Sequence, residues 1–304
     1  MVSIFLDNLL PVLICAGFGY VLQRRARLDI RSIGQVVFFI FSPCLIFDSL
    51  LKSEVSEPAL VRMTGFTWAV IAVMILVAGF VGWALRLDRQ RWATLIVSST
   101  FVNGGNFGLA IVAFAFGDEA LSYAVAFFIA STLAVYTVGV FVAGLGRADI
   151  GAAARELLRI PVFYAVVAAE VLRLGGVTLP LAIDRAVTLM ADAGIPVMLI
   201  VLGMQIAASR LSRLSGSQRW AVGASVSLQL VVAPLVAWSL ANVFGLDGAA
   251  RQAGILEASM PAAVVTTVIA MQYDLDLDLA TAGVLLSTLL SPFTLTPLIA
   301  WLGG

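Results

Sequence analysis

Apolar residues occur in runs of about 20 that recur along the whole chain, separated by short polar segments rich in arginine. A helix that crosses a bilayer needs about 20 such residues. One run could belong to the buried core of a soluble domain, but a whole chain of them could not. The pattern therefore predicts an all-α transmembrane protein.

The runs predict ten transmembrane helices. Their expected positions are 4–22, 33–51, 65–85, 92–116, 121–144, 157–174, 180–208, 219–243, 250–272 and 279–302. The first run lacks a basic leading region and a small-residue cleavage site, so it is interpreted as a span and not as a signal peptide.

Composition supports this interpretation and excludes a soluble domain of useful size. The 304 residues are 61% hydrophobic and 12% charged, with a mean hydropathy of +1.05, whereas soluble domains are about 25% charged. Cys15 and Cys44 both fall within predicted spans, which favours a packing role over a disulfide.

Basic residues are distributed unequally between the two alternating sets of loops. One set holds Arg24, Arg25, Arg27, Arg31, Arg86, Arg89, Arg91, Arg147, Arg155, Arg159, Arg210, Arg213 and Arg219. The other holds Lys52, Arg62, Arg173, Arg185 and Arg251. Because basic loops stay in the cytoplasm, we expect a multi-pass protein of the cytoplasmic (inner) membrane with both termini on the non-cytoplasmic side.

Short strings recur in the same order in the two halves of the chain. The matched pairs are Pro11 with Pro161, Pro43 with Pro196, Trp83 with Trp238, and Ser131 with Ser287. They indicate two five-helix repeats, at 1–146 and 157–304, joined by a short cytoplasmic linker at 147–156. An odd number of spans per repeat gives the halves opposite topology, and inverted repeats are typical of secondary transporters.

The fourth and ninth predicted spans carry helix-breaking residues at matching positions. The fourth contains "NGGNFG", from Asn103 to Gly108, and an offset of 156 from Gly105 leads to Pro261 in "EASMPAAVVTT". Discontinuous helices at equivalent positions of two repeats point to a binding site near the membrane midplane. The alternative is that the glycines only allow close helix packing and that Pro261 only kinks its helix. The candidate substrate-binding residues are Asn103, Gly104, Gly105, Asn106, Ser259, Met260, Pro261 and Thr266, with Asp48 from the second span.

These motifs resemble the auxin efflux carrier family, which includes the plant PIN proteins and many bacterial members. The resemblance covers essentially the whole chain, through "LPVLICAGFGYVLQRR", "FSPCLIFDSLLK", "NGGNFGLA", "EASMPAAV" and "LLSTLLS". It implies ten spans in two inverted repeats, a scaffold domain and a transport domain, crossed discontinuous helices 4 and 9, and elevator-like transport. Plant members export indole-3-acetate, and bacterial members are often labelled as carriers of small organic acids.

The chain departs from the family pattern at the crossing. Ala110 stands where the family usually has a proline, and its repeat partner is Thr266, where plant members also tend to have proline. The crossing is therefore expected either at Gly104-Gly105 with Pro261 or at Ala110 with Thr266. The long cytoplasmic loop of many plant members is missing, so regulation by loop phosphorylation is not expected.

Charged residues within spans are costly and are functional candidates. Asp48 and Lys52 share one helix face, and the plant carriers show an Asp-x-x-x-Lys in the same span. Asp192 and Glu257 are expected to face a polar interior, where burial favours the neutral form of a carboxyl group. All four are candidates for a coupling ion or proton. Gln205 and Gln229 carry less weight, because amides often only bridge helices.

The sequence lacks the residues and motifs that several other functional classes require. The chain has no histidine for a proton relay, no Walker motif, no zinc-ligand cluster and no nucleophile elbow. An enzyme, a cofactor, a metal and a nucleic-acid partner are therefore not expected. No interior arginine is available to clamp a carboxylate, so an anion would rely on amides and on half-helix N-termini.

The expected function is a secondary transporter of small organic anions such as monocarboxylates, with the lipid bilayer and an organic acid as partners. A Na⁺- or H⁺-coupled carrier of the bile-acid-symporter or antiporter type is the near alternative. A membrane receptor that does not transport is the other. A homodimer through the scaffold domain remains open.

Overall fold

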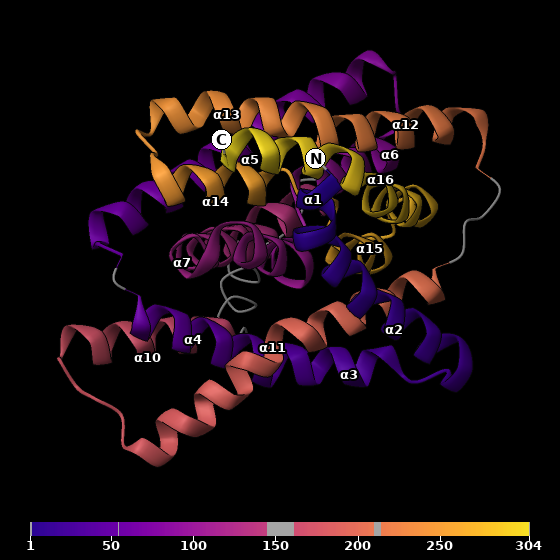
Figure 1. Ribbon diagram of the computed structural model, residues 1–304. Coiled ribbons are helices and arrows are strands. Elements are labelled where there is room, and N and C mark those ends of the chain that lie inside the picture. Colours follow the sequence, from indigo (N-terminus) through magenta and orange to yellow (C-terminus); the bar gives the residue numbers. More distant parts are fainter. Residues whose placement is uncertain (1, 54, 145–160, 210–213, 304) are drawn as a thin grey trace.

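The computed structural model describes residues 2–53, 55–144, 161–209 and 214–303. Every regular element in these ranges is helical, and their only strand-like pairing is an isolated antiparallel bridge between Val102 and Ala262. Seven of the described helices are long and apolar enough to cross a membrane. Figure 1 shows the arrangement of the helices.

The described helices of the first half run from Val2 to Ala143. They are α1 (Val2–Ile4), the π-helical turn η1 (Phe5–Leu9), α2 (Leu10–Ala26), α3 (Ile30–Val36), η2 (Val37–Phe41), α4 (Ser42–Lys52), α5 (Glu57–Ala84), α6 (Arg89–Thr100), η3 (Gly104–Gly108), α7 (Leu109–Ala134), η4 (Val135–Gly139) and α8 (Val140–Ala143). Gly117, with φ of 78°, is not helical and divides α7 into two pieces.

The described helices of the second half begin at Pro161. They are α10 (Pro161–Leu174), α11 (Leu181–Ala208), α12 (Gly216–Ser227), η5 (Leu228–Val232), α13 (Ala233–Val243), α14 (Gly248–Ala258), α15 (Val265–Gln272) and α16 (Leu277–Gly303). The predicted linker at 147–156 lies outside the described residues.

The structure has helix at each of the ten predicted spans. Only seven of the described helices, however, are long and apolar enough by themselves to count as membrane spans. Predicted spans four and five merge into one apolar run, Gly104–Ala143. The sixth is described over 14 residues, as α10, and the ninth consists of the short helices α14 and α15. The all-helical transmembrane class is confirmed, and the ten-helix inverted repeat stays a prediction.

The helices form two groups, which we call the panel and the crossing bundle. The panel contains α2, α3, η2, α4, α10 and α11, in which α2 and α4 both pack on α11 and α10 packs on α4. The crossing bundle contains α5 to α8 and α12 to α16. In Figure 1 the panel lies below the crossing bundle, and α7 and α15 lie between α11 and the upper helices.

Two glycines allow α2 and α11 to touch backbone to backbone. A Cβ atom at Gly19 would overlap the main-chain carbonyl of Ile200, and one at Gly203 would overlap that of Ala16. Small residues at such contacts are the usual means of close helix packing in membranes. Close backbone packing therefore holds α2 against α11, and no ion pair is needed between these two helices.

One carboxylate ties together three helix starts of the crossing bundle. Asp276 accepts hydrogen bonds from Arg91 Nε at 3.1 Å, from Gln218 Nε2 at 3.0 Å and from the backbone N–H of Leu279 at 3.0 Å. These residues belong to α6, α12 and α16. Because charge-assisted hydrogen bonds are strong, this cluster fixes the three helices relative to one another.

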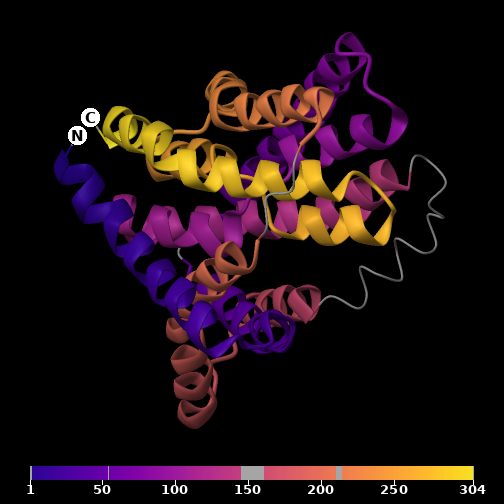
Figure 2. The ribbon, with the colours of Figure 1, turned by 90° about the vertical axis from the view of Figure 1, so that its right-hand side faces the viewer.

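The described ends of the chain lie together. Helix α1 contacts α16, and Figure 2 shows the N- and C-terminal ends at the same edge of the molecule. This arrangement agrees with an even number of membrane crossings.

Candidate functional site

Two helices are interrupted at the centre of the crossing bundle. Helix α6 ends at Thr100, and the chain runs through Phe101, Val102 and Asn103 before η3 begins at Gly104. Helix α14 ends at Ala258, and α15 begins at Val265 after six residues outside regular helix. Broken backbone at membrane depth is tolerated only where its polar groups find partners.

The two breaks cross and satisfy each other. The backbone N–H of Asn103 donates to the carbonyl of Pro261 at 2.7 Å, and that of Ala263 donates to the carbonyl of Phe101 at 2.9 Å. The N–H of Ala262 donates to Ser287 Oγ at 3.1 Å. Pro261 itself has no N–H to satisfy, which suits a position whose carbonyl accepts a hydrogen bond from the other break.

The break in the first half lies slightly earlier than either predicted position. The non-helical residues are 101–103, whereas Gly104 and Gly105 already belong to η3 and the half-helix begins before Phe107. Ala110 lies in regular helix α7, and Thr266 lies in the first turn of α15. The crossing therefore centres on Val102 and Ala262.

The glycines of η3 make room for two large side chains on different faces. A Cβ atom at Gly105 would lie 2.6 Å from the ring of Phe128. Cβ atoms at Gly104 and Gly108 would lie 2.6 Å and 2.5 Å from the carboxyl oxygen Oε2 of Glu257. The spacing of these glycines is thus explained by what they contact.

Glu257 occupies the far side of η3 from the cavity described next. Its side chain is 0% exposed, and neither carboxyl oxygen has a hydrogen-bond partner among the described residues. A carboxyl group without a partner in so apolar a place is costly unless it is neutralised. Glu257 is the most buried of the four coupling-ion candidates, since Asp48, Lys52 and Asp192 all remain partly or largely exposed.

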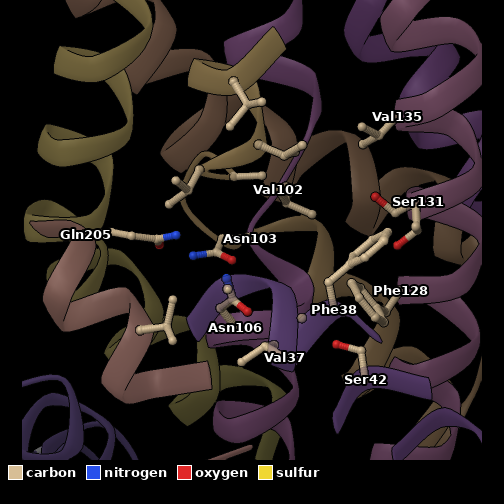
Figure 3. A pocket seen from close by; sticks show the side chains of 18 of the residues that line it. Val37, Phe38, Ser42, Val102, Asn103, Asn106, Phe128, Ser131, Val135 and Gln205 are labelled. Atoms are coloured by element: carbon tan, nitrogen blue, oxygen red, sulfur yellow. The ribbon is translucent and has the colours of Figure 1, made fainter. Parts of the chain in front are cut away.

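A cavity of about 440 Å³ lies between the panel and the crossing bundle. Figure 3 shows it from close by. The walls come from span two of the panel, from α11, from both breaks and from the helix after Gly117. The lining residues are Arg31, Gly34, Gln35, Val37, Phe38, Ser42, Val102, Asn103, Gly105, Asn106, Phe128, Ser131, Thr132, Val135, Tyr136, Val201, Gln205, Ala263, Val264, Val265 and Val268.

Three of the nine predicted substrate-binding residues line this cavity, namely Asn103, Gly105 and Asn106. Asn103 is 4% exposed, and its Nδ2 has no hydrogen-bond partner among the described residues. The first turns of η3 and α15 also reach the cavity, and the N–H groups of a first turn lack intrahelical acceptors. The cavity therefore presents hydrogen-bond donors on mostly apolar walls.

Five other predicted substrate-binding residues lie in or next to the two breaks but do not line the cavity. They are Gly104, Ser259, Met260, Pro261 and Thr266. The hydroxyls of Ser259 and Thr266 donate to the carbonyls of Ile255 and Ala263, at 2.6 and 2.7 Å. These residues support the breaks from within the crossing bundle.

Asp48 and Lys52 lie at the far end of span two from the cavity wall. They form an ion pair at 2.7 Å, and Thr188 of α11 accepts from Lys52 at 2.7 Å and donates to Asp48 at 2.9 Å. The cluster joins α4 to α11 within the panel. It does not contribute to the cavity.

Asp192 was expected to face the interior, and this prediction is wrong. Its side chain is exposed, because the buried face of α11 at this level is formed by Ala191, Gly194 and Met198. Gln229 is fully buried in η5, with neither amide atom partnered among the described residues, and it lies outside the cavity.

Arg31 lines the cavity from an exposed position at the start of span two, so it does not contradict the expectation that no interior arginine is present. Arg31, Gln35, Phe38 and Ser42 follow a helical spacing, so one face of span two forms this wall. The nearby Asp29 is engaged in capping α3, and its hydrogen bond from the Ser32 hydroxyl lowers the pKa of that carboxyl group. The polar stripe at the start of span two was the available sequence signal.

The sequence matches the membrane transport protein family twice, over residues 4–152 and over 147–299. An uncharacterized transporter of Methanothermobacter thermautotrophicus is 28% identical over 94% of each chain. A putative malonate transporter of Rhizobium meliloti is 25% identical over 86% of this chain and 84% of its own length. Auxin efflux carrier component 1 of Arabidopsis thaliana is 27% identical over 39% of this chain and 19% of its own length. The chain therefore belongs to the membrane transport protein family, the auxin efflux carrier-like family that its motifs resemble, and is a transmembrane transporter.

Proposed function

We propose that the protein is a secondary transporter of small organic anions, in which a carboxylate binds in the cavity beside the crossed breaks. The observation that carries this proposal is Asn103, whose buried amide nitrogen faces the cavity without a partner. Its backbone is fixed at the same time by the hydrogen bond to Pro261. An oriented and unpartnered donor in a buried cavity suits an acceptor from outside the chain.

The chemistry of the cavity favours a carboxylate on a partly apolar body. Asn103 and Asn106 provide amide donors, and the positive ends of the half-helices η3 and α15 favour an anion. Val37, Phe38 and Val268 are among the apolar walls. A volume of about 440 Å³ is that of a small-molecule site. Names of relatives that refer to malonate and auxin are compatible with this class.

An elevator movement is the proposed mechanism, with the crossing bundle sliding against the panel. The repeated family match and the paired breaks support two inverted repeats of five spans. The basic loops, together with Arg31 in the first turn of α3 at the cavity wall, support an opening toward the cytoplasm and termini on the other side.

Replacing Asn103 by alanine tests the proposal. Binding of a carboxylate should weaken by about 1–3 kcal/mol, the cost of leaving a buried partner unpaired. A thermal-shift screen of small carboxylates on the purified protein identifies the ligand, and titration of parent and variant gives the two affinities. Asn242→Ala is the matched control, because Asn242 accepts a hydrogen bond from Arg251 and lies away from the cavity.

Unchanged affinity in the folded Asn103→Ala protein would show that no anion binds at the break. The glycines would then serve packing alone. Counterflow in proteoliposomes separates a carrier from a receptor, because only a carrier exchanges labelled substrate across the membrane.

A coupled carrier is the second candidate, and Glu257 favours it. Its unpartnered carboxyl group lies against η3, opposite the cavity, so a proton or Na⁺ there would act on the same turn that presents Asn103 and Asn106. Transport by Glu257→Gln should lose its dependence on that ion while keeping binding of the carboxylate. Persistence of the full ion dependence in this variant would exclude Glu257 as the coupling site and favour uniport.

A further inference from the structure

The cavity contains a second unpartnered amide, opposite Asn103. Gln205 of α11 has a buried Oε1 atom with no hydrogen-bond partner among the described residues. Figure 3 shows the side chains of Gln205 and Asn103 pointing toward each other across the cavity. Two facing amides without a mutual hydrogen bond leave both groups available to one ligand.

The two amides come from different groups of helices. Asn103 belongs to the break before η3 in the crossing bundle, and Gln205 belongs to α11 in the panel. Helix α11 packs directly against η3, and its residues Val201 and Gln205, one turn apart, both line the cavity. The panel therefore contributes a polar group to the same end of the cavity.

We propose that Gln205 and Asn103 hold one substrate carboxylate between them, and that the Gln205 contact exists only while the cavity has its present shape. This inference rests on the proposed function. Rotation of the Gln205 amide by 180° exchanges Oε1 with Nε2 and turns the unpartnered position into a donor. Each amide then donates one N–H to a carboxylate oxygen, and hydrogen bonds to a charged acceptor are stronger than neutral ones. The ligand thereby bridges the panel and the crossing bundle.

A ligand that bridges the panel and the crossing bundle is held differently before and after one group slides against the other. Asn103 moves with the crossing bundle and keeps its ligand, whereas Gln205 stays with the panel and loses it. Gln205 is thus a specificity-determining residue for one side of the membrane only. A ligand can stabilise one state over another only through such a differential contact.

The test measures half-saturating concentrations from each side of the membrane separately. Parent, Gln205→Leu and Asn103→Ala are reconstituted in oriented proteoliposomes, with radiolabelled malonate and indole-3-acetate as probes in counterflow. The side to which the cavity opens is identified by the labelling of Arg31→Cys with an impermeant thiol reagent, in a protein in which Cys15 and Cys44 are replaced by serine. Gln23→Leu is the matched control, an amide-to-leucine change in α2 of the panel, where Gln23 also has a buried Oε1 without a partner among the described residues but does not line the cavity.

Gln205→Leu should raise the half-saturating concentration about tenfold on the side where residue 31 is labelled, with less than about a twofold change on the other side. Asn103→Ala should raise it on both sides. Gln205→Glu, which keeps the shape of the side chain, should have a larger effect than leucine on the same side because like charges repel.

Equal effects of Gln205→Leu and Gln205→Glu on the two sides, or no effect from either, would overturn the inference while Asn103→Ala still supports the proposed function. A parent protein that exchanges neither probe, or an Asn103→Ala variant that behaves like the parent, would overturn the proposed function and this inference with it.

Discussion

Glycine performs two different tasks in the panel and at the crossing. In the panel, Gly19 and Gly203 bring the backbones of α2 and α11 into contact. At the crossing, Gly104, Gly105 and Gly108 leave room for side chains, those of Glu257 and Phe128. The first pair fixes two helices together, whereas the second set surrounds a carboxyl group and a cavity wall.

The two groups of glycines therefore differ in the atoms that an added Cβ would meet, which are backbone atoms in the panel and side-chain atoms at the crossing. Backbone atoms cannot move away from an added methyl group, but the far end of a side chain can move at moderate cost. Substitution in the panel should therefore act on folding. Substitution at the crossing should act mainly on ion coupling through Glu257 and on substrate binding in the cavity.

The largest effect is expected for Gly19→Ala. The added Cβ would overlap the carbonyl of Ile200, so α2 and α11 must separate, at a cost of about 3 kcal/mol. Thermal unfolding in detergent, followed by the remaining monodisperse protein, measures the change.

Gly17→Ala is the matched control on the same helix. No atom lies within 4 Å of a Cβ placed at Gly17, so this variant should equal the parent or gain about 0.5–1 kcal/mol from better helix propensity. Equal melting temperatures for both variants would refute the backbone contact between α2 and α11.

A smaller effect is expected for Gly108→Ala, about 1–2 kcal/mol, because the methyl group meets the carboxyl end of Glu257. The double variant Gly108→Ala with Glu257→Ala should recover most of the loss, since the obstructing group is gone. The melting temperatures of the four proteins form a double-mutant cycle. Additive changes would mean that the two residues do not share this contact.

The smallest effect is expected for Arg31→Gln, which removes a charge at the cavity wall and leaves the glycines untouched. Apparent affinity for a carboxylate should fall about two- to fivefold at low salt, because exposed charges contribute little and are screened. Arg27→Gln removes the same charge four residues earlier, outside the cavity. A loss of the same size in both variants would assign the effect to general surface charge.

Much of the fold followed from the apolar runs. The long spans, the two interrupted helices and the cavity position of Asn103 and Asn106 agree with the sequence pattern, because a broken helix in hydrocarbon must be signalled by glycine, proline or amides. Glu257 was expected in the interior because it lies one turn before Pro261, and it is buried, although no polar partner surrounds its carboxyl group among the described residues.

The remaining features depend on contacts between distant segments. Nothing local distinguishes Gly105, which faces the cavity, from Gly104, which faces Glu257, because their roles are set by Phe128 and by α14. Arg31 was counted with the loops, although the first turn of α3 brings it to the cavity. The outward orientation of Asp192 likewise depends on which face α11 turns to α2 and α4.

The bridge between Val102 and Ala262 also constrains how the chain enters the membrane during its synthesis. Its partners are 160 positions apart, so at cellular translation rates the first break waits about 10–30 s for the second. In that interval the N–H of Asn103 and the carbonyl of Phe101 lack their final partners. Bare hydrocarbon would penalise each by several kcal/mol. We therefore expect the backbone at Phe101–Asn103 to keep water or the insertion machinery as its hydrogen-bond partner until Pro261–Ala263 has been made, late in the synthesis of the chain.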